Sequence, residues 1–167
     1  MTKPSNKISF ERTYQAPVED VWDLWTTAEG IESWWGPEGF SVRVSKLDLR
    51  PGGELHYAMT ATAPEQAEFM KRAGMPLTQE VRLTFTEVAP RRRLAFTTLA
   101  DFLPGVAPYP VASLVELFPE GSGVRMVLTH DAMHDEVWTQ RARMGWESQL
   151  GKLAHQLGKL AQAVALR

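Results

Sequence analysis

The chain has 167 residues, which is enough for one hydrophobic core and too few for two, so we expect a single domain over residues 8–167. A net charge of -2 and an isoelectric point of about 6.1 exclude the strongly basic surface that a nucleic-acid partner requires. Because the sequence has no cysteine, it excludes disulfides, thiolate metal sites and a cysteine nucleophile.

The first residues predict a location in the cytoplasm. Residues 1–7 are polar and lack the apolar core of a signal peptide, so we expect an extended or disordered N-terminus. No run of the sequence approaches the ~20 apolar residues of a membrane-spanning helix. We therefore expect a cytoplasmic protein without a membrane span.

One strand and two short helices are predicted next. Residues 8–14 alternate apolar and polar side chains, which is the period of a strand. Pro17 suits the first turn of a helix, which is predicted to follow it, and a second short helix is predicted over residues 28–34. Two glycines and a proline within residues 36–39 then end helical structure.

Six segments of strand length follow, each enriched in β-branched or aromatic residues. They cover residues 40–49, 54–60, 81–88, 94–102, 111–118 and 124–130. No helix between them is long enough for a parallel crossover, so the sequence predicts an antiparallel meander.

The connections in this meander differ in length and character. Three are short and polar, and two, at residues 61–80 and 103–109, are long and apolar, with a helical turn expected over residues 65–73. Because strands in a meander alternate in direction, both long connections are predicted to lie at one end of the sheet. We expect Trp34, Trp35, Phe69, Met70, Tyr109, Met133 and Trp138 to gather at that loop-rich end. This end is either the mouth of a pocket, a plain seal of the sheet, or a homodimer contact.

The last segment, residues 135–165, predicts one long amphipathic helix. Its apolar stripe has the helical period and consists of Trp146, Leu150, Leu153, Leu157, Leu160 and Val164. The first half of the helix instead mixes very large, very small and polar groups, namely Trp138, Ala142, Gly145, Trp146 and Gln149. That half is either ordinary core or the roof of an internal cavity.

Four short motifs carry a resemblance to a known family. Residues 12–22, 34–37, 48–54 and 144–150 resemble the bacterial relatives of the C-terminal domain of the heat-shock protein 90 ATPase activator. That family lies in the START and birch-pollen-allergen-like group, SRPBCC. The resemblance implies an α+β helix-grip fold, in which a curved antiparallel sheet wraps the long C-terminal helix and encloses an apolar cavity. The connection at residues 61–80 is longer than the family pattern, and the motifs carry over no catalytic residue.

The leading functional hypothesis is that a small hydrophobic or amphipathic ligand binds between the sheet and the C-terminal helix. The expected lining is Trp34, Trp35, Phe69, Met70, Phe85, Phe96, Tyr109, Met126, Trp138 and Trp146. We expect no cofactor. A metal site within residues 130–136 is disfavoured, because its histidines do not share a helical face and its acidic residues suit the start of the helix.

Two alternatives stay open. A polyketide cyclase or dehydratase would need an inward acid or base, for which the candidates are His56, Asp101, Glu116 and His130. The third alternative, an interaction module that stimulates a heat-shock ATPase, rests on the resemblance alone. The sequence identifies neither the ligand nor any catalytic residue.

Overall fold

The computed structural model describes residues 7–101, 103 and 105–165, with side chains up to residue 162. Residues 1–6 of the predicted N-terminal extension, the last residue of the predicted strand 94–102 and the side chain of Val164 lie outside the described residues. In the described part, no helix is both long and apolar enough to cross a membrane.

The described residues form seven strands and four helices. They are β1 (Lys7–Tyr14), α1 (Val18–Thr26), α2 (Ala28–Trp34), β2 (Phe40–Leu47), β3 (Glu54–Ala61), α3 (Pro64–Arg72), β4 (Thr78–Ala89), β5 (Arg93–Ala100), β6 (Tyr109–Glu120), β7 (Gly123–Asp131) and α4 (Glu136–Ala165). The predicted helical turn in the first long connection is a helix of nine residues, α3.

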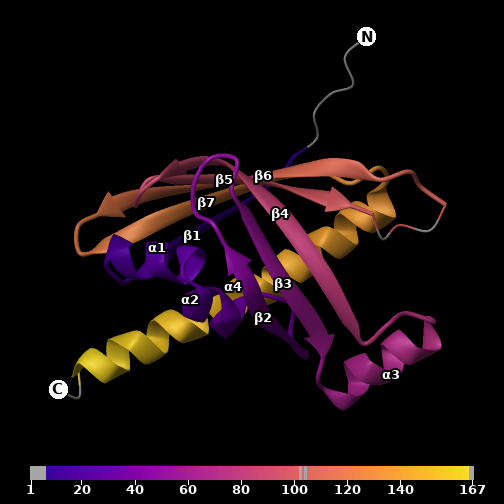
Figure 1. Ribbon diagram of the computed structural model, residues 1–167. Coiled ribbons are helices and arrows are strands. Elements are labelled where there is room, and N and C mark those ends of the chain that lie inside the picture. Colours follow the sequence, from indigo (N-terminus) through magenta and orange to yellow (C-terminus); the bar gives the residue numbers. More distant parts are fainter. Residues whose placement is uncertain (1–6, 102, 104, 166–167) are drawn as a thin grey trace, which may run out of the picture.

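All seven strands form one antiparallel sheet in the order β1-β7-β6-β5-β4-β3-β2. Figure 1 shows this sheet curving over α4, with α1 and α2 beside the C-terminal half of that helix and α3 beyond the ends of β3 and β4. The predicted helix-grip architecture, a curved antiparallel sheet around a long C-terminal helix, is therefore confirmed.

Local interactions fix the helix ends as the sequence suggests. The side chain of Thr27 accepts a hydrogen bond from the Gly30 amide and caps α2. At the start of α4, the Asp135 carboxylate accepts the amide N–H of Trp138 at 2.8 Å. Asp135 is one of the acidic residues that the sequence favoured for the start of the helix rather than for a metal site, and it does cap α4.

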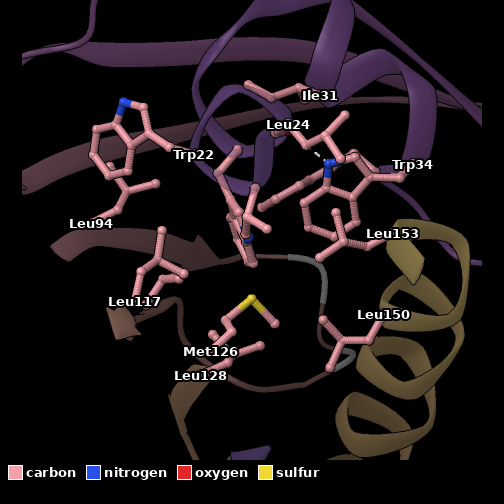
Figure 2. Close-up of a cluster of buried hydrophobic side chains, with 14 of the residues drawn as sticks. Trp22, Leu24, Ile31, Trp34, Leu94, Leu117, Met126, Leu128, Leu150 and Leu153 are labelled. Atoms are coloured by element: carbon pink, nitrogen blue, oxygen red, sulfur yellow. Dashed lines mark hydrogen bonds between the residues drawn. The ribbon is translucent and has the colours of Figure 1, made fainter. Parts of the chain in front are cut away.

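The hydrophobic interior consists of two separate clusters. The main cluster joins α1, α2 and the middle of α4 to the inner face of the sheet, and Figure 2 shows Leu150 and Leu153 of α4 facing Met126 and Leu128 across it. The smaller cluster lies at the start of α4. It consists of buried Ala100, Leu103 and Val111 with Val106, Tyr109, Met133 and Trp138 packed against them.

The predicted apolar stripe of α4 is buried from Trp146 to Leu157, as expected. The prediction is wrong at Leu160, whose side chain is 41% exposed. Figure 1 shows the reason, because the C-terminal turns of α4 run out past α2, where no strand covers them. The periodicity identified the buried face of α4 correctly, but it did not show at which residue the rest of the domain stops covering that face.

Candidate functional site

A band of small and polar side chains separates the two hydrophobic clusters. On β6 the inward positions are Val111 in the smaller cluster, then Ser113, then Val115 in the main cluster. Ser113 therefore interrupts an otherwise apolar face with a hydroxyl group that is 2% exposed. We call this band the middle layer, and it consists of Thr98, Ser113, His130 and Ala142.

α4 and β5 also carry a small or polar side chain between apolar ones at this level. One face of α4 presents Trp138 to the smaller cluster and Trp146 to the main cluster, and the small side chain of Ala142 lies between them. On β5, Thr98 pairs across the sheet with Val111. At this level β5, β6 and α4 therefore carry side chains that are small or can form hydrogen bonds, in place of aromatic rings and branched apolar chains.

A buried hydrogen bond forms the polar part of the middle layer. His130 on β7 is the antiparallel partner of Ser113, and its Nδ1 lies 2.6 Å from Ser113 Oγ. The imidazole also packs edge-on against Trp146, with ring centroids 5.5 Å apart. The pair is thus held between the sheet and α4.

Ser113 Oγ and His130 Nδ1 share one hydrogen bond, and the tautomer of the imidazole decides which of the two atoms donates. The second ring nitrogen, Nε2, is a donor in one neutral tautomer and an acceptor in the other. His130 therefore brings a neutral hydrogen-bonding group to the interior.

The middle layer is uncharged at neutral pH. Burial lowers the pKa of His130 to about 4, Asp131 acts weakly in the opposite direction, and Lys7 lowers the value further. The imidazole therefore stays neutral. It can donate or accept a hydrogen bond but holds no ion.

Tryptophan rings fill the interior next to the middle layer. The ring of Trp25 on α1 meets those of Trp34, Trp35, Trp146 and Phe96 at centroid distances of 4.7, 5.5, 6.1 and 6.5 Å. These distances are typical of aromatic pairs in contact. This part of the interior is therefore packed by the protein itself.

The N–H groups in this cluster are not equivalent. Trp34 Nε1 donates to the backbone oxygen of Leu24 at 2.7 Å, the bond drawn in Figure 2. Trp25 Nε1 is buried and has no acceptor among the described residues. The same holds for Nε2 of Gln149, whose Oε1 accepts the amide N–H of Gly36 at 3.2 Å. Two buried donors are thus unused.

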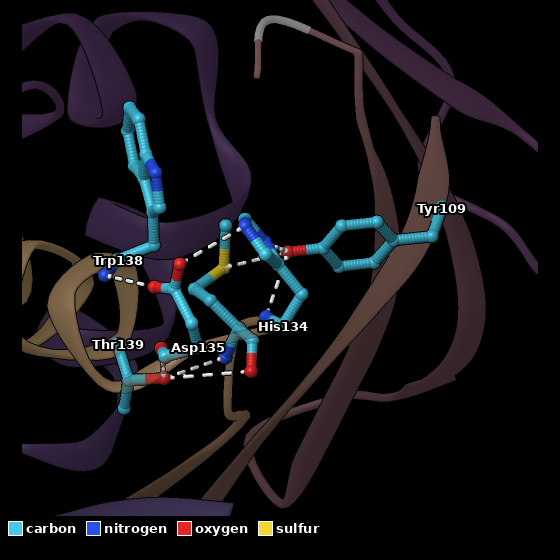
Figure 3. A network of polar contacts seen from close by, with 6 residues as sticks. Tyr109, His134, Asp135, Trp138 and Thr139 are labelled. Atoms are coloured by element: carbon cyan, nitrogen blue, oxygen red, sulfur yellow. Dashed lines mark hydrogen bonds and ion pairs between the residues drawn. The ribbon is translucent and has the colours of Figure 1, made fainter. Parts of the chain in front are cut away.

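A second polar network closes the end of the domain where α4 begins (Figure 3). The Tyr109 hydroxyl accepts the backbone N–H of His134 at 3.1 Å and lies 2.9 Å from its Nδ1. His134 Nε2 lies 3.3 Å from the carboxylate of Asp135, which also caps α4. This Tyr109–His134 latch ties the start of β6 to the start of α4.

The predicted lining residues lie in several places. Six belong to the main cluster, namely Trp34, Trp35, Phe85, Phe96, Met126 and Trp146. Tyr109 and Trp138 belong to the smaller cluster. Met70 is buried outside both clusters, whereas Phe69 on α3 is 66% exposed.

Of the seven residues expected to gather at the loop-rich end, Tyr109, Met133 and Trp138 pack together in the smaller cluster, whereas Trp34 and Trp35 belong to the main cluster and Phe69 is exposed. The antiparallel order of the strands places both long connections at the same end of the sheet, as predicted, with α3 beyond the ends of β3 and β4 (Figure 1). Trp34, the last residue of α2, and Trp35 turn inward to the main cluster instead.

Of the four candidate acids and bases, only His130 faces the interior. His56 and Glu116 lie on the outer face of the sheet and contact neighbouring charged side chains, and Asp101 is exposed. Within the described residues, no group of three or more His, Asp or Glu side chains is arranged to hold a metal ion. Of the four candidates, His130 is thus the one placed to act as an acid or base inside the domain.

Sequence reasoning missed Ser113, Trp25 and Gln149 as site residues. A signal for Ser113 was present, because it holds an inward position in an alternating strand between Val111 and Val115. For the two unused donors no signal existed, because whether an N–H finds an acceptor depends on tertiary contacts.

Two surface depressions lie away from the middle layer. One, of about 370 Å³, follows the outer face of β4 to β7 beside Arg93, Leu114 and Thr129. The other, of about 330 Å³, lies between α1, α2 and the end of α4, beside Asp23 and Gln156. Both are open hollows bordered by charged or polar side chains.

Comparison with solved structures shows the same fold in several bacterial proteins. A protein from Chromobacterium violaceum superposes with a TM-score of 0.75 at 23% identity, covering 91% of this chain and 96% of that one. The AHSA1 protein from Silicibacter pomeroyi gives 0.71 at 23% identity, covering 92% and 98%. The AHSA1-like protein from Aeromonas hydrophila gives 0.68 at 22% identity, covering 97% and 96%.

These identities support the fold alone, and no curated protein matches this chain. A family model provides the assignment. The model described as Activator of Hsp90 ATPase homolog 1-like protein matches residues 15–158, which is most of the chain and includes β2 to β7, the middle layer and most of α4. The chain therefore belongs to the Activator of Hsp90 ATPase homolog 1-like protein family.

Proposed function

We propose that this protein binds a small hydrophobic or amphipathic molecule in the middle layer, between the inner face of the sheet and the first half of α4. One observation carries the proposal, namely that the core is divided in two by small and polar side chains on β5, β6, β7 and α4. A domain that needed only stability would gain more from apolar side chains at these positions.

The residues around the middle layer suit such a ligand. Trp146 and Phe96 border it on one side and Val111 and Trp138 on the other, so an apolar body would lie between rings and branched chains. His130 would offer a neutral hydrogen-bonding group from the sheet. Pockets for small molecules commonly combine apolar walls with a few placed polar groups.

The apolar area that a small ligand can bury limits the affinity. A ligand that buries roughly 300 Å² of apolar surface gains about 7 kcal/mol at ~25 cal/mol/Å², before the costs of ordering are subtracted. Micromolar binding is the upper limit expected from apolar contact alone. Tighter binding would need hydrogen bonds from the protein.

The proposed entrance is the end of the domain closed by the Tyr109–His134 latch. The smaller cluster there is formed by the end of β5, the connection from β5 to β6, the start of β6, the connection from β7 to α4 and the first turn of α4. Leu103 is buried in it, whereas Val106 is only partly buried. Segments of this kind open more readily than paired strands.

The test uses two alanines on α4. Ala142 lies in the middle layer, and Ala154 is exposed on the same helix. We expect Ala142→Leu to weaken binding of the neutral fluorescent probe phenylnaphthylamine at least tenfold, because the added side chain occupies the site. Ala154→Leu should bind as the unmodified protein does.

Native mass spectrometry of the freshly purified protein gives a second readout. A co-purified molecule should be present in the unmodified protein and in Ala154→Leu and absent from Ala142→Leu. Equal probe affinity in all three proteins, with Ala142→Leu folded, would place the site elsewhere.

A second candidate function, acid–base catalysis of the cyclase or dehydratase type, is favoured by the inward position of His130. With a pKa of about 4, its imidazole would act as an uncharged hydrogen-bond donor or a weak base. A pH–rate profile that loses its acid limb in His130→Gln would support catalysis. An unchanged profile would leave binding as the function.

A further inference from the structure

The last turns of α4 leave an apolar side chain uncovered beside an open hollow. This end of the helix runs past α2, and Leu160 there is 41% exposed (Figure 1). Leu160 and Gln156 line the hollow of about 330 Å³ from α4, and Leu24 lines it from α1. The hollow therefore offers a small apolar contact, although polar side chains border most of it.

Carboxylates border the hollow on the side of α1 and α2. Asp20, Asp23 and Glu29 belong to its lining, and within the described residues none of them forms an ion pair with a cation. Asp20 and Glu29 lie in the first turns of their helices, where the helix dipole stabilises an acid. Asp23 instead lies in the last turn of α1, which contains no basic residue and where the dipole disfavours an acid. Asp23 is thus the carboxylate that the chain itself leaves uncompensated.

The electrostatics of Asp20 agree with an excess of negative charge at this place. Burial raises the pKa of Asp20, and the charges of Asp23 and Glu19 raise it further. Like charges that lie close together repel one another, so a cation brought to this edge of the hollow would be stabilised.

α4 carries such a cation at the edge of the same hollow. Residues three apart are neighbours on a helix surface, so Lys159 adjoins Gln156 there. Lys159 is exposed and forms no ion pair within the described residues, whereas Lys152, one helix face earlier, donates to the backbone oxygen of Gly36. The surface therefore presents a cation, Lys159, and an anion, Asp23, that do not pair within one chain.

A surface that carries both members of such a pair is self-complementary. A two-fold axis brings a surface against its own copy, so that each residue of a contacting pair is used twice. At this hollow the axis would place Leu160 of each copy against the hollow of the other. It would also place Lys159 of each copy beside the Asp23 of the other, which compensates both charges.

We propose that a second copy of this chain docks at this surface, with the end of α4 from each copy seated in the hollow of the other and with Lys159 paired to Asp23 across a two-fold axis. The inference goes beyond the proposed function, because the hollow lies at the C-terminal half of α4, away from the middle layer and from the loop-rich end. Two short helices and one helix end make a small contact, so we expect a weak dimer with a dissociation constant on the order of 10 µM.

Sedimentation velocity of the full chain measures this dimer. Between ~1 and ~200 µM, the unmodified protein should pass from monomer to dimer. Leu160→Ala should raise the dissociation constant at least about threefold, because it removes apolar contact on both sides of the axis. A protein that stays monomeric up to ~200 µM overturns the second copy as the occupant of the hollow.

Charge reversal tests the proposed pair. Asp23→Lys and Lys159→Glu each replace an attraction by a repulsion at two symmetry-related places, so each should raise the dissociation constant at least about tenfold. The double variant restores opposite charges across the axis and should return to within about threefold of the unmodified protein. Both positions are exposed, and recovery in the double variant excludes misfolding as the cause of the loss.

Lys71→Glu on α3 is the matched control. It changes the net charge by the same amount as Lys159→Glu, at an exposed lysine that does not line the hollow, and should dimerise as the unmodified protein does. An equal loss of dimer in Lys71→Glu overturns the pairing, because the effect would then come from net charge. Single variants that dimerise normally, or a double variant that stays monomeric, overturn it as well.

Cysteine cross-linking identifies the surfaces that meet, because the chain has no cysteine of its own. Asp23→Cys protein mixed with Lys159→Cys protein should form the mixed disulfide at least about tenfold faster than Asp23→Cys mixed with Ala154→Cys. Ala154 is an exposed position of α4 that does not line the hollow. Equal rates in the two mixtures would place the second copy on another surface and overturn the inference.

Discussion

The Oγ atom of Ser113 and the Nδ1 atom of His130 lie 2.6 Å apart on neighbouring strands, inside a domain whose other inward positions on β6 and β7 are almost all apolar. Such a pair costs little while both members are bonded and costs much more when one is lost. It is both a polar feature of the proposed site and a measurable element of stability.

The first prediction concerns stability below neutral pH. The pKa of His130 falls from 6.5 to about 4 on folding because burial disfavours the charged imidazole. In the pH range between these values the unfolded chain binds more protons, so the stability that His130 contributes is complete above 6.5 and is lost as pH falls toward 4. Compared with His130→Gln, the free energy of unfolding should drop by an additional ~2–3 kcal/mol between about pH 7.5 and about pH 4.5.

Urea denaturation at the two pH values gives this difference. His155→Gln, at an exposed position of α4, is the matched control and should follow the unmodified protein. If His130→Gln and the unmodified protein lose stability in parallel, the imidazole is not neutral in the folded state.

The second prediction compares two glycines. A Cβ at Gly30 would collide with the backbone oxygen of Asp23 and the Cα of Leu24, which belong to α1. Gly30→Ala should therefore destabilise the protein by about 2–4 kcal/mol. Gly151 lies exposed within α4 with open space around it, so Gly151→Ala should stabilise by about 1 kcal/mol through helix propensity.

Thermal denaturation of the two variants checks both signs at once. A similar shift of the melting temperature in the two would show that α1 and α2 do not approach each other closely at Gly30.

The third prediction concerns the Tyr109–His134 latch. Tyr109→Phe removes the acceptor of the His134 backbone N–H and should cost about 1–2 kcal/mol. The loss should appear as faster hydrogen exchange of the His134 amide and the first turn of α4, with strands β3 and β4 unaffected.

Asp135→Asn is the comparison for the latch. Asparagine keeps the cap on the Trp138 amide and removes only the ion pair with His134, which is half exposed and contributes little. Exchange at His134 as fast in Asp135→Asn as in Tyr109→Phe would show that the ion pair, not the tyrosine hydroxyl, holds this junction.

The sequence was sufficient for the fold because each element carried a local signal. The helical period of Trp146, Leu150 and Leu153 identified the buried face of α4, and strand length and turn chemistry gave the meander. The long first connection was also recognised, including its helix, although the helix begins at Pro64 rather than Glu65.

The candidate site could be predicted only in part. Aromatic side chains such as Trp35 and Phe96 were correctly taken as interior, because large apolar groups in strands and helix ends are buried. Alternation alone does not say which face of a strand is inward, so His56 and His130 were equal candidates until the register was known. That Met70 is buried outside the cluster that contains Tyr109 depends on tertiary packing and has no signature in a single segment.

The most direct test of the central claim is to locate a bound probe by magnetisation transfer to labelled methyl groups. With phenylnaphthylamine bound, we predict nuclear Overhauser effects from the probe to the methyl groups of Ala142 in the middle layer and of Val111 beside it, and none to exposed Ala154. Effects confined to Ala95, Ala112 and Leu114 would place the probe in the depression on the outer face of the sheet and contradict the account.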